Sequence, residues 1–280
     1  MSAQVAVLSA LHVYPIKSCR GIELDAAQLT PTGLADDRHW MLVRPSGRFV
    51  TQRELPRMAL ISTALSARAL TLAAPGAAPL IVSREQSGES APVTVWGFTG
   101  RGIDCGEEAA LWCTSFLGTP LRLMRFDASA PRTCSVDWTG DVPATTEFSD
   151  GFPILVISRA SLAELNSRLP KALPMERFRP NLVLDGLDPH GEDALDEIVF
   201  DTDAGPVRLK LVKPCARCPI PDVDPETGIA GHAVGDTLAS YRADARLDGA
   251  LTFGMNAVIV EGIERALRVG MTGRARYRFD

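Results

Sequence analysis

The residues best suited to chemistry are two cysteines three positions apart, in the segment Lys213-Pro-Cys-Ala-Arg-Cys218. The apolar and basic run at 207–212 leads into this segment and predicts a β-strand. Pro219, Pro221 and Pro225 follow the segment, and these prolines exclude a regular helix or a central strand there. We therefore expect both thiols at a strand end or on a loop, where a sulfur can be presented to a bound group.

Several chemistries use such a pair of thiols. A thioredoxin-type dithiol needs its first cysteine at a helix N-terminus, which the prolines disfavour. A structural zinc site needs four ligands, whereas the chain has no second Cys-x-x-Cys motif and its four histidines are scattered. The residues leave two further alternatives open. One is an inert, buried pair, and the other is a single thiolate that binds a soft or redox metal, with Arg217 nearby to keep it deprotonated.

Basic residues at two other predicted turns are suited to binding an anion. Lys17 and Ser18 come at the end of a predicted strand over residues 5–16, and a lysine beside a hydroxyl can bind a phosphate. Arg38 precedes an apolar run and is expected at the start of a strand. The alternatives are a solvated turn lysine and a surface ion pair between Asp37 and Arg38.

A third basic group alternates along the chain. Arg177, Arg179 and Asn181 are two residues apart, which predicts that they face one side of an extended segment. Two guanidiniums and an amide on one face are suited to an anion and a heterocycle. The alternative is a solvated edge strand that carries basic residues.

Composition narrows the class of protein. The chain has 280 residues, a hydrophobic fraction of 46% and a net charge of −5, which suits a globular protein with a sizeable core and counts against nucleic-acid binding. The sequence shows no signal peptide and no apolar run long enough to span a membrane. Six cysteines are too few for a disulfide scaffold in a chain of this length, and we expect them reduced in a cytoplasm.

The elements that must position these residues are mainly β. Short apolar runs between turns predict antiparallel strands over the first hundred residues, as in a barrel or sandwich. Helical spacing predicts a helix at 106–117, against which Cys105 and Cys113 pack. The sequence of residues 127–150 predicts a long loop, and we place a domain boundary within it without a sharp position. After this loop we expect a helix capped by Ser158 and ending near residue 169, a hairpin at 197–211, a strand at 257–260 and a strand pair at 267–279.

Seven segments in a fixed order also resemble a known family. They are Tyr14-Pro-Ile-Lys-Ser18, Asp37-Arg-His-Trp40, Arg101-Gly-Ile-Asp-Cys-Gly106, Leu162-Ala-Glu-Leu-Asn166, Phe178-Arg-Pro-Asn181, Cys215-Ala-Arg-Cys218 and Val223-Asp-Pro-Glu-Thr-Gly228. On these segments the sequence resembles the MOSC superfamily, in particular its two-part chains, which include the amidoxime-reducing component and related bacterial molybdenum enzymes. The resemblance implies a mixed, mainly β fold with a few helices. It places an N-terminal MOSC β-barrel domain at residues 1–120 and a MOSC-type β-barrel domain at 121–280, with a cofactor between them.

The resemblance implies a molybdenum cofactor, in which one molybdopterin holds the metal and a protein thiolate completes its coordination. The second cysteine of the family pattern is the metal ligand, which is Cys218 here. Family contacts to the pterin and phosphate match Lys17, Ser18, Arg38, Arg179, Asn181 and the backbone at Ala216 and Arg217. Ser149, Asp150 and Asn256 fall where the family lines the pocket, and Asp150 is expected to orient or protonate the substrate. The resemblance also implies pyridoxal phosphate binding as an expectation.

The implied reaction is the two-electron reduction of N-hydroxylated compounds: hydroxylamines, amidoximes or N-hydroxylated bases. The cysteines lack the Cys-x4-Cys-x2-Cys spacing of a plant-type iron–sulfur domain, so electrons are expected from a separate ferredoxin- or flavin-type reductase. We expect a soluble, cytoplasmic form with no membrane partner. The alternative function is a cofactor-binding or sulfur-carrier protein that uses the same cysteine without turnover of its own.

Overall fold

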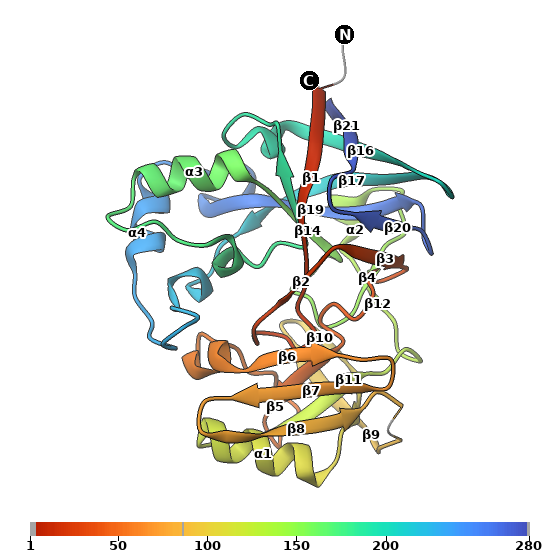
Figure 1. The fold of residues 1–280 in the computed structure, drawn as a ribbon, viewed down its shortest axis with the longest axis vertical. Helices are drawn as coiled ribbons and strands as arrows, with labels where there is room; N and C mark the ends of the chain where they lie inside the picture. The colour runs from red at the N-terminus through yellow and green to blue at the C-terminus, as the bar shows by residue number, and fades with distance from the viewer. Residues whose placement is uncertain (1–3, 86, 279–280) are drawn as a thin grey trace.

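The computed structural model describes residues 4–85 and 87–278 (Figure 1). Seven strands of this part of the chain close into a barrel, in the upper half of Figure 1. β14 (Ile154–Ser158) and β15 (Leu182–Asp185) run parallel, the other neighbours are antiparallel, and β19 (Ala250–Glu261) pairs back onto β14 to close the barrel. In order around the barrel the strands are β14 (Ile154–Ser158), β15 (Leu182–Asp185), β1 (Gln4–Val13), β21 (Thr272–Tyr277), β16 (Leu195–Thr202), β17 (Gly205–Ala216) and β19 (Ala250–Glu261).

The barrel is filled by apolar side chains at alternate strand positions. Leu8 of β1, Phe200 of β16, Leu209 of β17 and Ala257 of β19 belong to one buried cluster. Alternation along a strand sends every second side chain to the same face, which is why these residues share one core. Two short strands extend the barrel sheet: β2 (Ile22–Leu24) beside β1, and β18 (Ala243–Asp244) beside β19.

A second layer, in the lower half of Figure 1, consists of small antiparallel sheets. One sheet has the order β5 (Trp40–Val43), β11 (Arg122–Phe126), β10 (Phe98–Asp104), β9 (Ser90–Val95), and another is the meander β6 (Ser62–Leu65), β7 (Ala69–Ala74), β8 (Ala77–Ser83). The predicted helix at 106–117 is confirmed as α1 (Glu107–Leu117) and ends at Gly118, which has a left-handed φ of 70°. Cys105 and Cys113 are buried in the same cluster as Leu123 of β11, as expected.

The remaining elements are short, and several of them pack on the barrel. The predicted loop at 127–150 is mostly irregular, and Ser158 caps α3 as predicted by accepting a hydrogen bond from the backbone N–H of Ser161. The described helices are thus few, and none is long and apolar enough to cross a membrane. The short elements are β3 (Ala26–Thr30), β4 (Gly33–Leu34), β12 (Arg132–Thr133), α2 (Val136–Thr139), β13 (Thr145–Thr146), α3 (Arg159–Ser167), α4 (Ala233–Ala239) and β20 (Ala266–Arg268), with 3-10 turns at Pro56–Leu60, Met175–Phe178, Gly191–Ala194, Ile220–Asp222 and Ala245–Leu247.

Two local predictions differ from the structure. Residues 175–181 are not extended: Met175–Phe178 form a 3-10 turn, and Arg179 follows with a left-handed φ of 58°. The strands predicted at 267–279 form, but they pair elsewhere, because β20 joins β3 and β21 lies between β1 and β16. Residue 279 lies outside the described residues.

The two halves of the chain exchange strands. β1, from the start of the chain, lies between β15 and β21 of the barrel. In the opposite direction, β11 pairs with β5 and β10 of the second layer. Strands from each side of residue 120 therefore pair with strands from the other side. The domain limits 1–120 and 121–280 stay a proposal. The mixed, mainly β fold class is confirmed.

Candidate functional site

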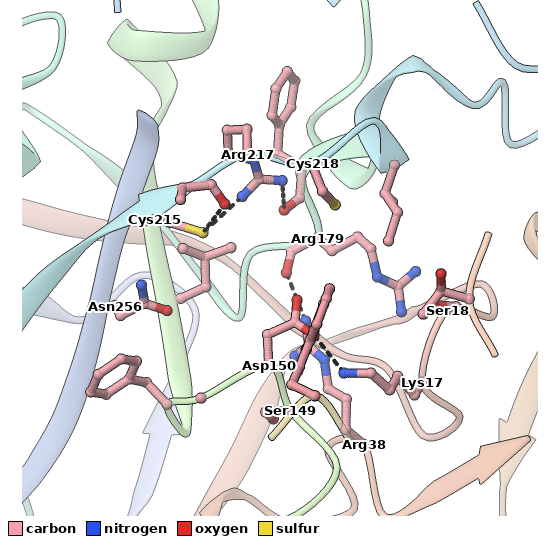
Figure 2. Close-up of a pocket in the computed structure, with 18 of the residues that line it drawn as sticks. Lys17, Ser18, Arg38, Ser149, Asp150, Arg179, Cys215, Arg217, Cys218 and Asn256 are labelled. Carbon is pink, nitrogen blue, oxygen red and sulfur yellow. Dashed lines mark hydrogen bonds and ion pairs between the residues drawn. The ribbon is translucent and has the colours of Figure 1, made fainter. Parts of the chain in front are cut away.

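One pocket collects the residues that the sequence singles out. The space between its lining residues is about 770 Å³ with the open mouth included. Residues far apart in the sequence meet here, and Figure 2 shows their side chains converging. The sequence-predicted residues that line the pocket are Lys17, Ser18, Arg38, Ser149, Asp150, Arg179, Asn181, Ala216, Arg217, Cys218 and Asn256.

Lys17 and Asp150 form an ion pair across 133 residues of sequence (Figure 2). Lys17 Nζ donates to Asp150 Oδ1 at 2.6 Å and to the carbonyl oxygen of Phe148 at 2.7 Å. Only 6% of the Lys17 side chain is exposed, whereas 67% of the Asp150 side chain is open to the pocket. Lys17 is therefore a buried cation that holds the loop of Asp150, and the alternative of a solvated turn lysine is excluded.

The pair shifts the acid–base behaviour of each residue. Burial lowers the pKa of Lys17, and the cationic Arg132 and Arg38 lower it further, while Asp150 opposes them. Burial within the pocket acts to raise the pKa of Asp150, but the ammonium of Lys17 and a hydrogen bond from Trp96 outweigh it and hold that pKa well below its usual range. Asp150 is therefore a carboxylate at neutral pH, with a fixed negative charge at the pocket wall.

Arg38 lies behind this pair and is held by three partners. Its Nη1 donates to Asp37 Oδ2 at 2.5 Å and to Asn181 Oδ1 at 3.1 Å, and its Nη2 donates to the carbonyl oxygen of Arg179 at 3.0 Å. Asp37 is buried, so this is not the surface ion pair of the alternative reading. Asn181 also bonds Leu155 and His12 across the barrel, and its amide therefore positions Arg38.

The side chain of Arg179 lies in the pocket, whereas that of Arg177 lies outside it. Arg179 lines the pocket, lies over the Tyr14 ring at 4.2 Å and donates to the carbonyl oxygen of Cys19 at 2.6 Å. Burial and the neighbouring Arg38 lower the pKa of Arg179 to about 10, so it stays cationic at neutral pH. Arg177 instead forms an ion pair with Asp224 at 2.9 Å, outside the pocket. The predicted common face is wrong because the left-handed backbone at Arg179 turns the chain between the two guanidiniums.

The thiols lie at the end of β17, as the sequence predicts. Cys215 is within the strand, and Cys218 follows it, before the 3-10 turn that the prolines allow. Both are partly exposed, whereas the other four cysteines are buried, which separates this pair from inert core thiols. Burial raises the pKa of Cys215, against the effect of Arg217. Asn256 fixes the same strand end through a hydrogen bond to the carbonyl oxygen of Lys213 at 3.2 Å.

The lining has a surplus of positive charge. Four arginines and one lysine border the pocket, against the single carboxylate of Asp150. Ser18, Arg38 and Arg179 all have left-handed φ values, between 52° and 67°. Such conformations are uncommon outside glycine and cluster at functional sites. The pocket is thus arranged for an anionic group with a soft ligand nearby.

Sequence reasoning missed several residues of the site, and three of them form or support the wall beside Asp150. Trp96 lies at the turn between β9 and β10, and its indole Nε1 donates to Asp150 Oδ1 at 3.0 Å. Arg53 borders the pocket with its guanidinium 4.3 Å above the Trp96 ring. Arg132 lies beneath the loop and donates to the carbonyl oxygens of Ser149 and Asp150. The pair Trp96-Gly97, a large aromatic residue next to a turn-forming glycine, was the one signal in the sequence that could have drawn attention to this wall.

Comparisons with known proteins agree with this geometry. The MOSC N-terminal beta barrel domain matches residues 5–120, and the MOSC domain matches residues 143–272. Mitochondrial amidoxime-reducing component 1 of Homo sapiens is 38% identical over 250 residues, which are 85% of this chain and 73% of that protein. The chain belongs to the MOSC family. Component 2 of Bos taurus is 36% identical over 249 residues, and component 2 of Rattus norvegicus is 37% identical over 251, with the same shares.

Membership of the MOSC family confirms the resemblance drawn from the seven segments. The match at 5–120 covers Lys17, Ser18 and Arg38, while the match at 143–272 covers Asp150 and the thiols. The pocket of this MOSC protein is therefore built from both matched regions.

Proposed function

We propose that this MOSC protein reduces N-hydroxylated compounds at a molybdenum cofactor bound in the pocket. The observation that carries the proposal is the placement of a partly exposed thiol, Cys218, in a basic pocket with one ionised carboxylate. The likeness to proteins named amidoxime-reducing components supports the reaction class, an N-reductive oxidoreductase. Hydroxylamines, amidoximes and N-hydroxylated bases are the proposed substrates.

The residues present fit such a cofactor. Arg179 Nη2 is buried and has no hydrogen-bond partner among the described residues, and a buried donor of this kind calls for an acceptor such as a phosphate oxygen. The surplus of basic residues suits a phosphate-bearing pterin. Cys218 offers the thiolate that a soft or redox metal takes. When bound, the cofactor supplies the redox chemistry: two electrons and two protons break the substrate N–O bond and give the N–H compound and water.

The basic residues have separate tasks in this proposal. Lys17, Arg38 and Arg179 hold the anionic end of the cofactor, and each charge-assisted contact contributes about 1.5–3 kcal/mol. Asn181 keeps Arg38 in place, while Ser18, Ser149, Asn256 and the backbone at 216–217 shape the wall. Cys218 is the metal ligand.

Asp150 is proposed to orient the substrate. Because its pKa is held low, Asp150 is ionised near neutral pH, so it has no proton to donate and its carboxylate can accept a charge-assisted hydrogen bond from a substrate N–H. Of the two roles that the sequence leaves open for this residue, orientation and protonation, the electrostatics favour orientation.

Electrons are proposed to come from a separate protein of the ferredoxin or flavin-reductase type. The relatives' names do not identify this donor, and a cytoplasmic location also stays a prediction of the sequence. The comparisons give no support to pyridoxal phosphate binding.

Metal and pterin analysis of the purified protein tests the proposal, together with reduction of benzamidoxime by a chemical electron donor. We expect molybdenum and pterin in near-equal amounts, and formation of benzamidine. A persulfide on Cys218 in metal-free protein would instead favour the sulfur-carrier alternative. If the protein contains neither metal nor persulfide and stays inactive after cofactor loading, the two thiols are an inert pair.

A further inference from the structure

The turn between β9 and β10 places an aromatic ring at the wall of the pocket. Trp96 is the first residue of the two-residue turn between Val95 and Phe98, and its left-handed φ of 54° is what such a hairpin turn requires at that position. Its surface is 45% exposed, although its indole nitrogen is tied to Asp150. A tryptophan that lines the pocket, is tethered to Asp150 and is still open to solvent offers ring surface to whatever enters the pocket.

Two neighbours hold the indole in a defined position. Arg53 lies over the ring at 4.3 Å, and the Phe49 ring packs against it with centroids 5.2 Å apart and a tilt of 58°. Arg53 is itself fixed by a hydrogen bond from its Nε to Thr51 Oγ1 at 3.2 Å. The wall formed by Trp96 and Arg53 is thus built before any ligand arrives, which reduces the ordering cost of binding.

One carboxylate oxygen of Asp150, beside this ring, has no hydrogen-bond donor among the described residues. Lys17 and Trp96 both donate to Oδ1, and no described residue donates to Oδ2. Since 67% of the Asp150 side chain is open to the pocket, Oδ2 is free to accept a hydrogen bond from a ligand. The unused acceptor and the exposed indole belong to side chains joined by a 3.0 Å hydrogen bond.

We propose that Trp96 and Asp150 together determine substrate specificity, and that they select planar N-hydroxylated amidines and bases. Such compounds offer an N–H to Asp150 Oδ2 and a planar surface to the wall formed by Trp96 and Arg53. The inference rests on the proposed function, since it assigns the substrate class of the same pocket. Small hydroxylamines have no ring to contact Trp96 and gain only the Asp150 contact, so they are the less favoured substrates.

The test compares benzamidoxime, which has an aromatic ring and an N–H, with hydroxylamine, which has no ring. The holoprotein is assayed with a chemical electron donor as wild type, Trp96→Ala and Trp96→Phe, with Leu111→Ala as a control at an exposed position of α1. We expect Trp96→Ala to raise KM for benzamidoxime by about threefold to tenfold, and to leave KM for hydroxylamine nearly unchanged. Trp96→Phe keeps a ring and should restore most of the preference, and Leu111→Ala should match wild type.

A second measurement does not depend on turnover. Benzamidine carries the planar N–H group but no N–O bond, and its binding to the holoprotein is followed by calorimetry. We expect weaker binding in Trp96→Ala than in Trp96→Phe. If wild type reduces both substrates and Trp96→Ala leaves the KM ratio unchanged, the inference is wrong and the proposed function stands. If wild type reduces neither, the proposed function fails and the benzamidine titration alone decides the inference: equal affinity in wild type and Trp96→Ala overturns it.

Discussion

The guanidinium of Arg217 donates a hydrogen bond to Sγ of Cys215 at 3.1 Å, and its other terminal nitrogen donates to the carbonyl oxygen of Phe178 at 2.9 Å. The charge of Arg217 therefore lies against the thiol that the family pattern does not select as the metal ligand. In the view of Figure 2 the guanidinium turns toward Cys215, and the sulfur of Cys218 lies on its other side. The two thiols of one short segment thus have different surroundings, although the sequence places them almost together.

Arg179→Ala should lower cofactor occupancy more than Arg177→Ala. Arg179 lines the pocket and has a buried nitrogen without a described partner, whereas Arg177 is neutralised by Asp224 outside it. Loss of one charge-assisted contact costs about 1.5–3 kcal/mol. Pterin released and oxidised from each purified variant can be measured by fluorescence. Equal pterin content in the two variants would count against the assignment of Arg179.

Glu192 predicts a pH dependence of stability away from the site. Its side chain is fully buried and accepts hydrogen bonds from the backbone N–H of Ser158 at 3.1 Å and from Ser161 Oγ at 2.7 Å. Burial raises the pKa of Glu192 despite these bonds. Between its ordinary value of about 4.3 and the raised pKa, the folded state keeps a proton that the unfolded chain has released. The free energy of unfolding therefore falls as pH rises through this window.

Glu192→Gln removes this titration and keeps an acceptor for the Ser158 N–H. Measured by urea unfolding, the stability of wild type relative to Glu192→Gln should decrease as pH rises through the window above about 4.3. Glu108→Gln, at an exposed position of α1, should not show this dependence. A constant difference between wild type and Glu192→Gln across the pH range would show that Glu192 does not titrate in this way.

Turnover should need an external electron donor. The sequence has no flavin motif and no cysteine spacing for an iron–sulfur cluster, so a reduced nicotinamide has nothing to deliver its hydride to. With nicotinamide alone, loaded protein should leave hydroxylamine nearly unreduced. A ferredoxin- or flavin-type reductase, or a chemical reductant, should start the reaction. Vigorous turnover with nicotinamide alone would contradict the need for a separate partner.

The sequence predicted much of the site because motifs can be matched without knowing how the chain folds. Lys17 and Asp150 are 133 residues apart, and no local pattern shows that they meet. Lys17 belongs to one of the seven segments, and Asp150 falls where the family lines the pocket, so the resemblance predicts that they meet; the structure brings them together. The strand before the thiols and the helix α1 were predictable from periodicity, because their apolar residues repeat with the local geometry of each element.

Predictions from residue spacing were wrong where the backbone leaves the regular helical and extended conformations. The alternation of Arg177 and Arg179 predicts one face only if the segment is extended, and a left-handed residue breaks that condition. Trp96 and Arg132 were missed for another reason. Their roles come from contacts with residues 149–150, such as the bond from Trp96 to Asp150 and the bond from Arg132 to the carbonyl oxygen of Asp150. A contact of this kind leaves no periodic signal in the sequence.

The two thiols should differ sharply when replaced by serine. A metal-bound thiolate is fully deprotonated, and the hydroxyl of serine is a harder and far less acidic ligand. Cys218→Ser should therefore abolish N–O reduction and change the molybdenum absorption spectrum, while pterin stays bound through Lys17, Arg38 and Arg179. Pterin content, absorption and benzamidoxime reduction measured on the same preparation separate loss of the ligand from loss of the cofactor.

Cys215→Ser is the matched control on the same strand end. Serine keeps an acceptor for Arg217, so the 3.1 Å contact has a replacement and the loss should be limited to packing, about 1 kcal/mol. The metal spectrum and most of the activity should remain. An inactive Cys215→Ser beside an active Cys218→Ser would show that the other sulfur is the ligand. Full activity in both variants would remove the thiolate from the mechanism, because a reaction that tolerates serine at either position does not depend on sulfur bound to the metal.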